Sequence, residues 1–217
     1  MKLKLNVCLA LLCCLTVSMR APAEEQKIHV ACVGDSITYG AGVEKREVNN
    51  YPVVLGKLLG DKYETKNFGV SGATLLRNGD NPYWKQGAFK SASDYQPQIV
   101  VIKLGTNDSK PQNWKHKDEF AKDLGDMVDQ FAKLPSTPKI YLCLPAPAYA
   151  VQWGINEEII KDQVIPIIQQ VAKEKNLSTI DIHTALAGHP ELFPDKIHPN
   201  AAGAALLAKA VAEAISK

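Results

Sequence analysis

The sequence predicts an α/β fold in which one parallel β-sheet carries helices on both of its faces. Short apolar runs alternate along the chain with longer segments whose apolar residues recur at helical spacing. Strands and helices that alternate in this way are typical of parallel sheets, because each helix returns the chain to the edge where the next strand begins. Polar clusters follow several of the predicted strands, and ligands bind such sheets at the carboxyl ends of the strands.

Five segments are predicted as strands from their apolar and β-branched content. They are residues 27–33, 63–68, 98–104, 139–144 and 178–182. The run at 98–104 is almost continuously apolar, which indicates a strand buried on both faces. The run at 63–68 is more polar, so we expect it at an edge of the sheet.

Four longer segments are predicted as helices. They are residues 50–60, 117–133, 156–174 and 200–216. Pro52 suits a first helical turn, where its missing N–H has no partner to lose. Pro166 lies inside a helical pattern and predicts a kink there.

The first residues predict a secretory signal peptide over residues 1–23. Lys2 and Lys4 precede an uncharged, mostly apolar run over residues 5–19, and Ala21-Pro22-Ala23 provides a small-residue cleavage site. A membrane-spanning helix needs about 20 apolar residues, so this run is short for a permanent span. We therefore expect a protein exported to the periplasm or beyond, without stable insertion in a membrane.

Two other interpretations of this segment stay open, an uncleaved anchor and a lipoprotein modified at Cys13. The second is disfavoured by Leu12, which is bulky for a lipoprotein site. The remaining residues, 24–217, show no linker, repeat or low-complexity stretch and are predicted to form one domain. We expect the two cysteines of this domain, Cys32 and Cys143, to be buried and free.

Composition excludes several classes of protein. The 217 residues include 25 Lys and Arg against 23 Asp and Glu, a net charge of +2. This balance gives no reason to expect binding to nucleic acid. Five cysteines are too few for a fold built on disulfides.

The polar residues at the strand ends have the chemistry of nucleophilic acyl transfer. This reaction needs a hydroxyl, a base that takes its proton and a group that orients the base. Ser36, His198 and Asp195 fill these roles, and one short turn can hold Asp195 beside His198. The backbone N–H groups of Ser36 and Gly69 and the side-chain amide of Asn107 are the predicted donors of an oxyanion hole.

These residues resemble the blocks of the SGNH hydrolases, also called the GDSL esterase/lipase family. The blocks read Gly34-Asp35-Ser36-Ile37, then Gly69, then Gly105-Thr106-Asn107-Asp108, and finally Asp195-Lys196-Ile197-His198-Pro199. The resemblance implies a flavodoxin-like three-layer αβα sandwich with five parallel strands in the order 2-1-3-4-5. It also implies an acyl-serine intermediate and neither metal nor cofactor.

The resemblance extends to a secreted bacterial branch of carbohydrate or sialate O-acetylesterases. The stretches GVSGATLL, NPYWK and KLGTNDSKPQNW carry it. We therefore expect an acetyl ester on a glycan as substrate. Trp84 and Trp153 are candidates for stacking on a sugar ring.

Two further functions stay open at this point. One is a lysophospholipase or thioesterase of the same family, which would act on longer acyl chains. The other is a glycan-binding module without catalysis, which is disfavoured because every catalytic residue type is present.

Overall fold

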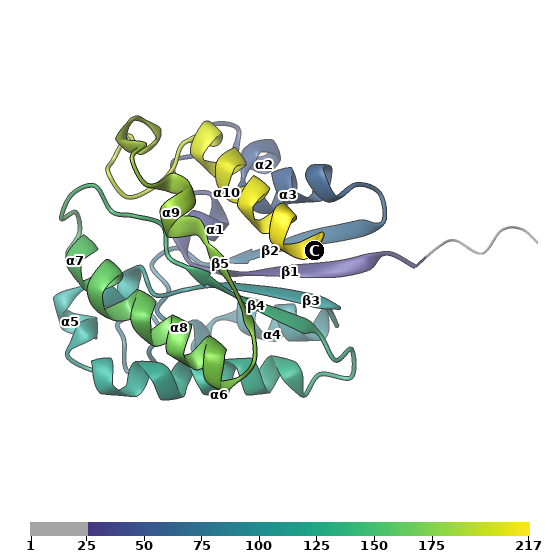
Figure 1. Cartoon of the computed structure of the whole chain (residues 1–217), viewed down its shortest axis with the longest axis horizontal. Helices are drawn as coiled ribbons and strands as arrows, with labels where there is room; N and C mark the ends of the chain where they lie inside the picture. Colours follow the sequence, from purple (N-terminus) through teal and green to yellow (C-terminus); the bar gives the residue numbers. More distant parts are fainter. Residues whose placement is uncertain (1–25) are drawn as a thin grey trace, which may run out of the picture.

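A computed structural model describes residues 26–217 and contains one parallel five-stranded sheet (Figure 1). The strands lie in the order β2-β1-β3-β4-β5. They are β1 (Ile28–Gly34), β2 (Tyr63–Gly69), β3 (Ile99–Lys103), β4 (Lys139–Leu144) and β5 (Ser178–Asp181). Each strand begins and ends within one residue of its predicted limits, and the predicted α/β sandwich and strand order are confirmed.

Helices cover both faces of the sheet. They are α1 (Ser36–Tyr39), α2 (Arg46–Asn49), α3 (Tyr51–Leu59), α4 (Gly87–Asp94), α5 (Pro111–Trp114), α6 (Phe120–Ala132), α7 (Glu157–Ile159), α8 (Ile165–Glu174), α9 (Ile182–Leu186) and α10 (Ala201–Ile215). In Figure 1, α3 and α10 lie on one side of the sheet, and α4, α6 and α8 lie on the other. The four segments predicted as helices therefore all contain helix.

Successive side chains of a strand point to opposite faces of the sheet, which divides the core into two layers. On β1, Val30 and Cys32 pack toward α3 and α10, whereas Ala31 and Val33 pack toward the opposite face. All five residues of β3 are buried, as expected for a central strand. The edge strand β2 contains no buried residue, which agrees with its polar sequence.

Pro166 changes the geometry of the predicted helix over 156–174. A π-helical turn over Ile160–Val164 separates α7 from α8, and Pro166 occupies the first turn of α8. Because proline has no N–H and its ring crowds the carbonyl four residues earlier, the preceding turn widens. The predicted irregularity is thus present as a π-turn.

Cys32 and Cys143 are buried and free, as predicted. They lie on β1 and β4, which β3 separates. Burial raises the pKa of the Cys32 thiol to about 12 and raises that of Cys143 as well. Both thiols therefore behave as small apolar side chains rather than as nucleophiles.

Within residues 26–217, no helix is long and apolar enough to cross a membrane. The predicted signal peptide over residues 1–23 lies outside the described residues.

Candidate active site

Ser36 is held at the first turn of a short helix directly after β1. Asp35 caps helix α1, and its carboxylate accepts the Ile37 N–H at 2.9 Å. Because the first N–H groups of a helix have no partner within it, the Ser36 N–H is free to meet a ligand at this helix end. Ser36 as a whole is 6% exposed, so water has little access to it.

A buried ion pair fixes the capping residue. The Lys103 ammonium, at the end of β3, lies 3.0 Å from both carboxylate oxygens of Asp35 and 3.0 Å from the Thr106 hydroxyl. The Lys103 and Asp35 side chains are both fully buried. This pair ties the turn that carries Ser36 to the turn that carries Asn107.

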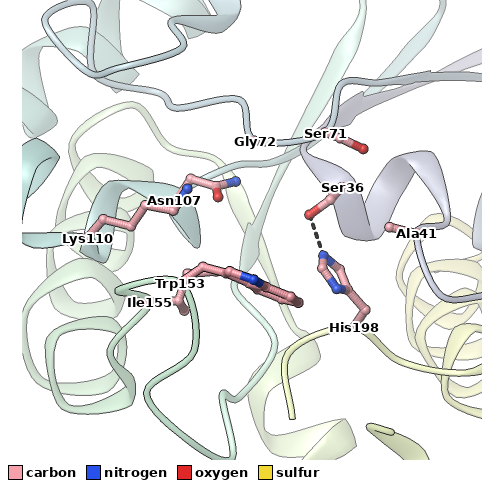
Figure 2. A pocket seen from close by; sticks show the side chains of 9 residues that line it. All are labelled: Ser36, Ala41, Ser71, Gly72, Asn107, Lys110, Trp153, Ile155 and His198. Carbon is pink, nitrogen blue, oxygen red and sulfur yellow. Dashed lines mark hydrogen bonds between the residues drawn. The ribbon is translucent and has the colours of Figure 1, made fainter. Parts of the chain in front are cut away.

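His198 and Asp195 share one turn, and the turn brings them to Ser36. One Asp195 oxygen accepts the backbone N–H groups of Ile197 at 2.9 Å and His198 at 2.7 Å. The other Asp195 oxygen lies 2.7 Å from His198 Nδ1, and His198 Nε2 lies 2.8 Å from Ser36 Oγ (Figure 2). The structure therefore brings together the three residues that the sequence predicts as nucleophile, base and orienting acid.

The chain of hydrogen bonds assigns a direction to the protons. An ionised carboxylate only accepts, so His198 Nδ1 carries its proton toward Asp195, and the unprotonated Nε2 faces Ser36. Burial acts to raise the pKa of Asp195. The hydrogen bonds from His198 and from the Ile197 N–H outweigh burial and lower this pKa below its usual range. Asp195 thus stays ionised and keeps Nε2 ready to take the serine proton.

A cavity of about 230 Å³ opens beside Ser36. It is lined by Ser36, Ala41, Ser71, Gly72, Asn107, Lys110, Trp153, Ile155 and His198. Figure 2 shows Ser36 and His198 on one side of this pocket, Asn107 and Lys110 on the other, and Trp153 beneath them. Among the described residues, no three His, Cys, Asp or Glu side chains gather as a metal site.

The prediction that Gly69 supplies an oxyanion donor is wrong. Its N–H donates to the Asn67 side chain at 2.9 Å, and Gly69 does not line the pocket. A Cβ at Gly69 would lie 2.2 Å from the Tyr39 backbone nitrogen, so glycine serves the close packing of β2 against α1. Gly72, three residues later, lines the pocket instead.

Gly72 follows the end of β2 and lies in the pocket wall. Its φ of 78° falls in the left-handed region that favours glycine. Among residues 26–217, no hydrogen-bond acceptor is found for its N–H. The sequence signal that could have identified it is Ser71-Gly72, a turn dipeptide after a strand, whereas Gly69 still belongs to β2.

Asn107 lies in the pocket wall as predicted and is 3% exposed. Its amide nitrogen donates to the Ala73 carbonyl at 3.1 Å, which leaves a second N–H of the same amide for a ligand. This bond also joins the Asn107 turn to the Gly72 turn.

Trp84 and Trp153, the two candidates for stacking on a sugar, lie in different environments. Trp153 lines the pocket, is 57% exposed, and its ring centroid lies 5.5 Å from that of His198. The prediction that Trp84 contacts substrate is wrong, because its indole donates to the Leu75 carbonyl and Arg77 stacks on its ring. Trp84 therefore fixes the loop between β2 and β3 and is absent from the pocket wall.

Hydrogen bonds from both sides hold the loop that carries Trp153, residues 145–156. The Tyr149 N–H donates to the Lys196 carbonyl at 2.8 Å, and the Asn156 N–H donates to the Ser109 hydroxyl at 3.1 Å. Beside the loop, His183 pairs with Glu157 at 2.7 Å and does not line the pocket. The loop is thus tied both to the His198 turn and to the Asn107 turn.

Comparison with known proteins agrees with this geometry. The family model described as the GDSL-like lipase/acylhydrolase family matches residues 32–206. The chain belongs to this family. An acetylxylan esterase of Xylanibacter ruminicola is 44% identical over 216 residues, covering 91% of this chain and 45% of that protein. A multidomain esterase of Ruminococcus flavefaciens is 27% identical over 154 residues, covering 65% of this chain and 19% of that protein. This GDSL-like chain thus spans less than half the length of the curated relatives it matches.

Two solved structures of other esterases share the fold. Est24, a carbohydrate acetylesterase from Sinorhizobium meliloti, has a TM-score of 0.70 at 22% identity, covering 88% of this chain and 99% of that one. The aryl esterase of M. smegmatis has a TM-score of 0.70 at 19% identity, covering 87% and 98%.

Asn107→Ala is expected to lower kcat for an acetyl ester by about 10²–10³-fold, because a preorganised donor to the developing oxyanion is lost. The lost bond to Ala73 should cost about 1 kcal/mol of the free energy of unfolding. Asn78→Ala is the matched control, since Asn78 is exposed and its side chain bonds only Glu119 within the described part of the chain. Steady-state kinetics check this prediction, and an unchanged kcat in Asn107→Ala would remove Asn107 from the oxyanion hole.

Asp108 gives the stability of the fold a defined pH dependence. Burial raises its pKa to about 7, although the N–H groups of Leu76 and Leu75 favour the ionised form. Between about pH 4 and pH 7 the folded chain keeps this proton while the unfolded chain has lost it. The unfolded state therefore binds fewer protons, and the free energy of unfolding falls as pH rises, by at most about 1.4 kcal/mol per pH unit.

Asn cannot titrate, so the free energy of unfolding of the wild type minus that of Asp108→Asn should fall over this interval and become constant above about pH 7. Urea denaturation at a series of pH values measures it. A difference that stays constant from pH 4.5 to pH 7 would contradict a raised pKa.

Proposed function

We propose that this chain is a serine esterase that releases acetyl groups from carbohydrates through an acyl-serine intermediate at Ser36. The observation that carries the proposal is the continuous chain of hydrogen bonds from Asp195 through His198 to Ser36, at the mouth of a small cavity. The 44% identity to an acetylxylan esterase and the fold shared with a carbohydrate acetylesterase support it.

In the first half of the reaction, His198 Nε2 takes the Ser36 proton while Oγ attacks the ester carbonyl carbon. The C–O double bond becomes a single bond to an oxyanion, which receives hydrogen bonds from the Ser36 N–H, the Gly72 N–H and the Asn107 amide. When the tetrahedral intermediate collapses, the bond from the carbonyl carbon to the sugar oxygen breaks, and His198 gives its proton to this oxygen, which leaves as a hydroxyl. An acetyl-serine remains.

In the second half, His198 takes a proton from water, and the hydroxide attacks the acetyl carbonyl through the same oxyanion hole. The bond to Ser36 Oγ then breaks, and His198 returns the proton to this oxygen. Asp195 stays ionised throughout and stabilises the imidazolium that forms twice in each cycle.

The size of the cavity supports a short acyl group. At about 230 Å³ it lies below the range of about 300–1,000 Å³ typical of pockets for drug-sized ligands. Its apolar wall consists of Ala41, Ile155 and the exposed ring of Trp153. An exposed aromatic ring beside the nucleophile also suits packing against the apolar face of a sugar.

Acetate release from acetylated xylan, pectin and O-acetylated sialic acids, together with p-nitrophenyl acetate and octanoate, tests this proposal. We expect acetyl esters to be hydrolysed at least about tenfold faster than octanoyl esters, because the cavity offers a longer chain few apolar side chains to pack against. Faster hydrolysis of octanoate would favour a lysophospholipase or thioesterase instead. No hydrolysis of any ester would favour a glycan-binding module.

We also propose that the protein acts after export, in the periplasm or outside the cell. Lys2, Lys4, the apolar run over 5–19 and the Ala21-Pro22-Ala23 site support this proposal. Mass spectrometry of the protein from its native host should find an N-terminus at Glu24. An N-terminus at Met1 on the folded protein would contradict it.

A further inference from the structure

Lys110 places a positive charge at the wall of the pocket, and the proposed chemistry at Ser36 does not use this charge. Of the nine lining residues, Lys110 is the only lysine, arginine, aspartate or glutamate. It follows Asn107 on the same turn, and its N–H donates to the Asn107 carbonyl at 3.3 Å. In Figure 2 its side chain runs toward Asn107, on the side of the pocket opposite His198.

The Lys110 ammonium has no carboxylate partner among the described residues. The ion pairs of the fold use other cations, such as Lys103 with Asp35 and Lys175 with Asp129. Lys110 is partly exposed and lines the pocket beside Asn107. A cation without a counter-ion in a pocket wall attracts an anionic group of the ligand that fills the pocket.

The backbone of Lys110 is fixed at the wall of the pocket. Its carbonyl accepts the N–H groups of Asn113 at 2.9 Å and Trp114 at 2.8 Å, which anchors the backbone at the start of α5. Gly154 passes close to the base of this side chain, because a Cβ there would be in ordinary contact, 3.8 Å from Lys110 Cβ and Cγ. The loop that carries Trp153 therefore packs directly on this side chain.

We propose that Lys110 binds a carboxylate on the sugar next to the acetyl ester, so that the pocket favours acetylated glycans containing a sugar acid. This inference rests on the proposed esterase function and adds a charge requirement to its substrate. Trp153 and Lys110 then act on one ligand, with the ring against the apolar face of a sugar and the ammonium on its carboxylate. The carboxylate could come from a uronic acid branch or from a sialic acid.

The test compares kcat/KM for acetylated xylo-oligosaccharides that carry a glucuronic acid branch with kcat/KM for the same oligosaccharides without it. We expect a ratio of about 10 in the wild type, which corresponds to one charge-assisted contact. The ratio should approach 1 in Lys110→Met and persist in Lys110→Arg, and rising NaCl should lower it in the wild type. Lys115→Met is the matched control, because Lys115 is exposed and lies outside the pocket wall.

A parallel arm with O-acetylated sialic acid distinguishes the two sources of carboxylate. If only this substrate loses kcat/KM in Lys110→Met, the carboxylate is that of a sialic acid. A wild-type ratio near 1 together with no effect on the sialic acid substrate would overturn the proposal. So would a wild-type ratio of about 10 that Lys110→Met leaves unchanged, or equal losses in Lys110→Met and Lys110→Arg on all substrates.

Binding to Ser36→Ala separates recognition from turnover. Calorimetry with the acidic and neutral oligosaccharides should show about tenfold tighter binding of the acidic one, lost on adding Lys110→Met. If the wild type hydrolyses no acetyl ester while this difference in Kd is present, the proposed function fails and the carboxylate site stands. If hydrolysis is present and the difference in Kd is absent, the carboxylate site fails alone.

Discussion

Ser36→Ala is expected to lower kcat/KM for p-nitrophenyl acetate by about 10⁴-fold or more. The substitution removes the atom that forms the acyl-enzyme, and the other groups of the site cannot compensate because the triad works as a unit. Residual hydrolysis should come from the oxyanion donors alone. Burst and steady-state kinetics measure the loss.

The fold of Ser36→Ala should be intact. Among residues 26–217, the Ser36 side chain bonds only His198, whereas Asp35 caps the helix. Thermal unfolding should therefore shift by little, and Ser91→Ala, an exposed serine on α4, provides the matched control. Equal ester hydrolysis in Ser36→Ala and wild type would remove Ser36 as the nucleophile.

Lys103→Met is expected to lower the free energy of unfolding by about 3–5 kcal/mol. It leaves the fully buried Asp35 carboxylate without its counter-charge, and an unpaired buried charge is costly. Activity should fall as well, because Asp35 caps the turn that presents Ser36. Urea denaturation and esterase kinetics measure the two effects.

A double variant and an exposed pair make this test specific. Lys103→Met with Asp35→Asn should recover part of the stability, since it buries no unpaired charge. Lys90 and Asp94 form a pair of the same residue types on the surface of α4, so Lys90→Met should change stability by less than about 1 kcal/mol. Similar losses in Lys103→Met and Lys90→Met would contradict the importance of burial. If Lys103→Met alone does not fold, the double variant still reports on the pair.

The sequence alone predicts the sheet well, because local composition determines it. Continuous apolar runs such as 98–104 have few alternatives to a central strand, and a polar run such as 63–68 fits only an edge. The Asp195–His198 turn is also predictable, because its partners are three residues apart. Ser36 then follows from the rule that sites form at the carboxyl ends of parallel strands.

The details that sequence reasoning missed depend on which polar groups are already bonded. Gly69 and Gly72 are equivalent as residue types, but Asn67 occupies the N–H of the first. Trp84 resembles Trp153 as an aromatic near the site, yet its indole bonds the Leu75 carbonyl. Such bonds arise from tertiary packing, which residue spacing does not encode.

The Lys103–Asp35 pair was missed for a similar reason. A lysine within an apolar strand has no local partner, and its counter-ion is distant along the chain. The β1–β3 register places the two residues together, because Lys103 pairs with Gly34, the residue before Asp35. The cation is visible in the sequence, but the partner becomes evident only once the strand order is known.

Covalent labelling tests the central claim, an acyl-serine at Ser36, most directly. A fluorophosphonate reacts only with a serine activated by a base, so the intact protein should gain one label, and peptide mass spectrometry should place it on Ser36. Ser36→Ala should gain none, and His198→Ala should react far more slowly. A label on another residue, or no label on an enzyme that still hydrolyses acetyl esters, would contradict the mechanism.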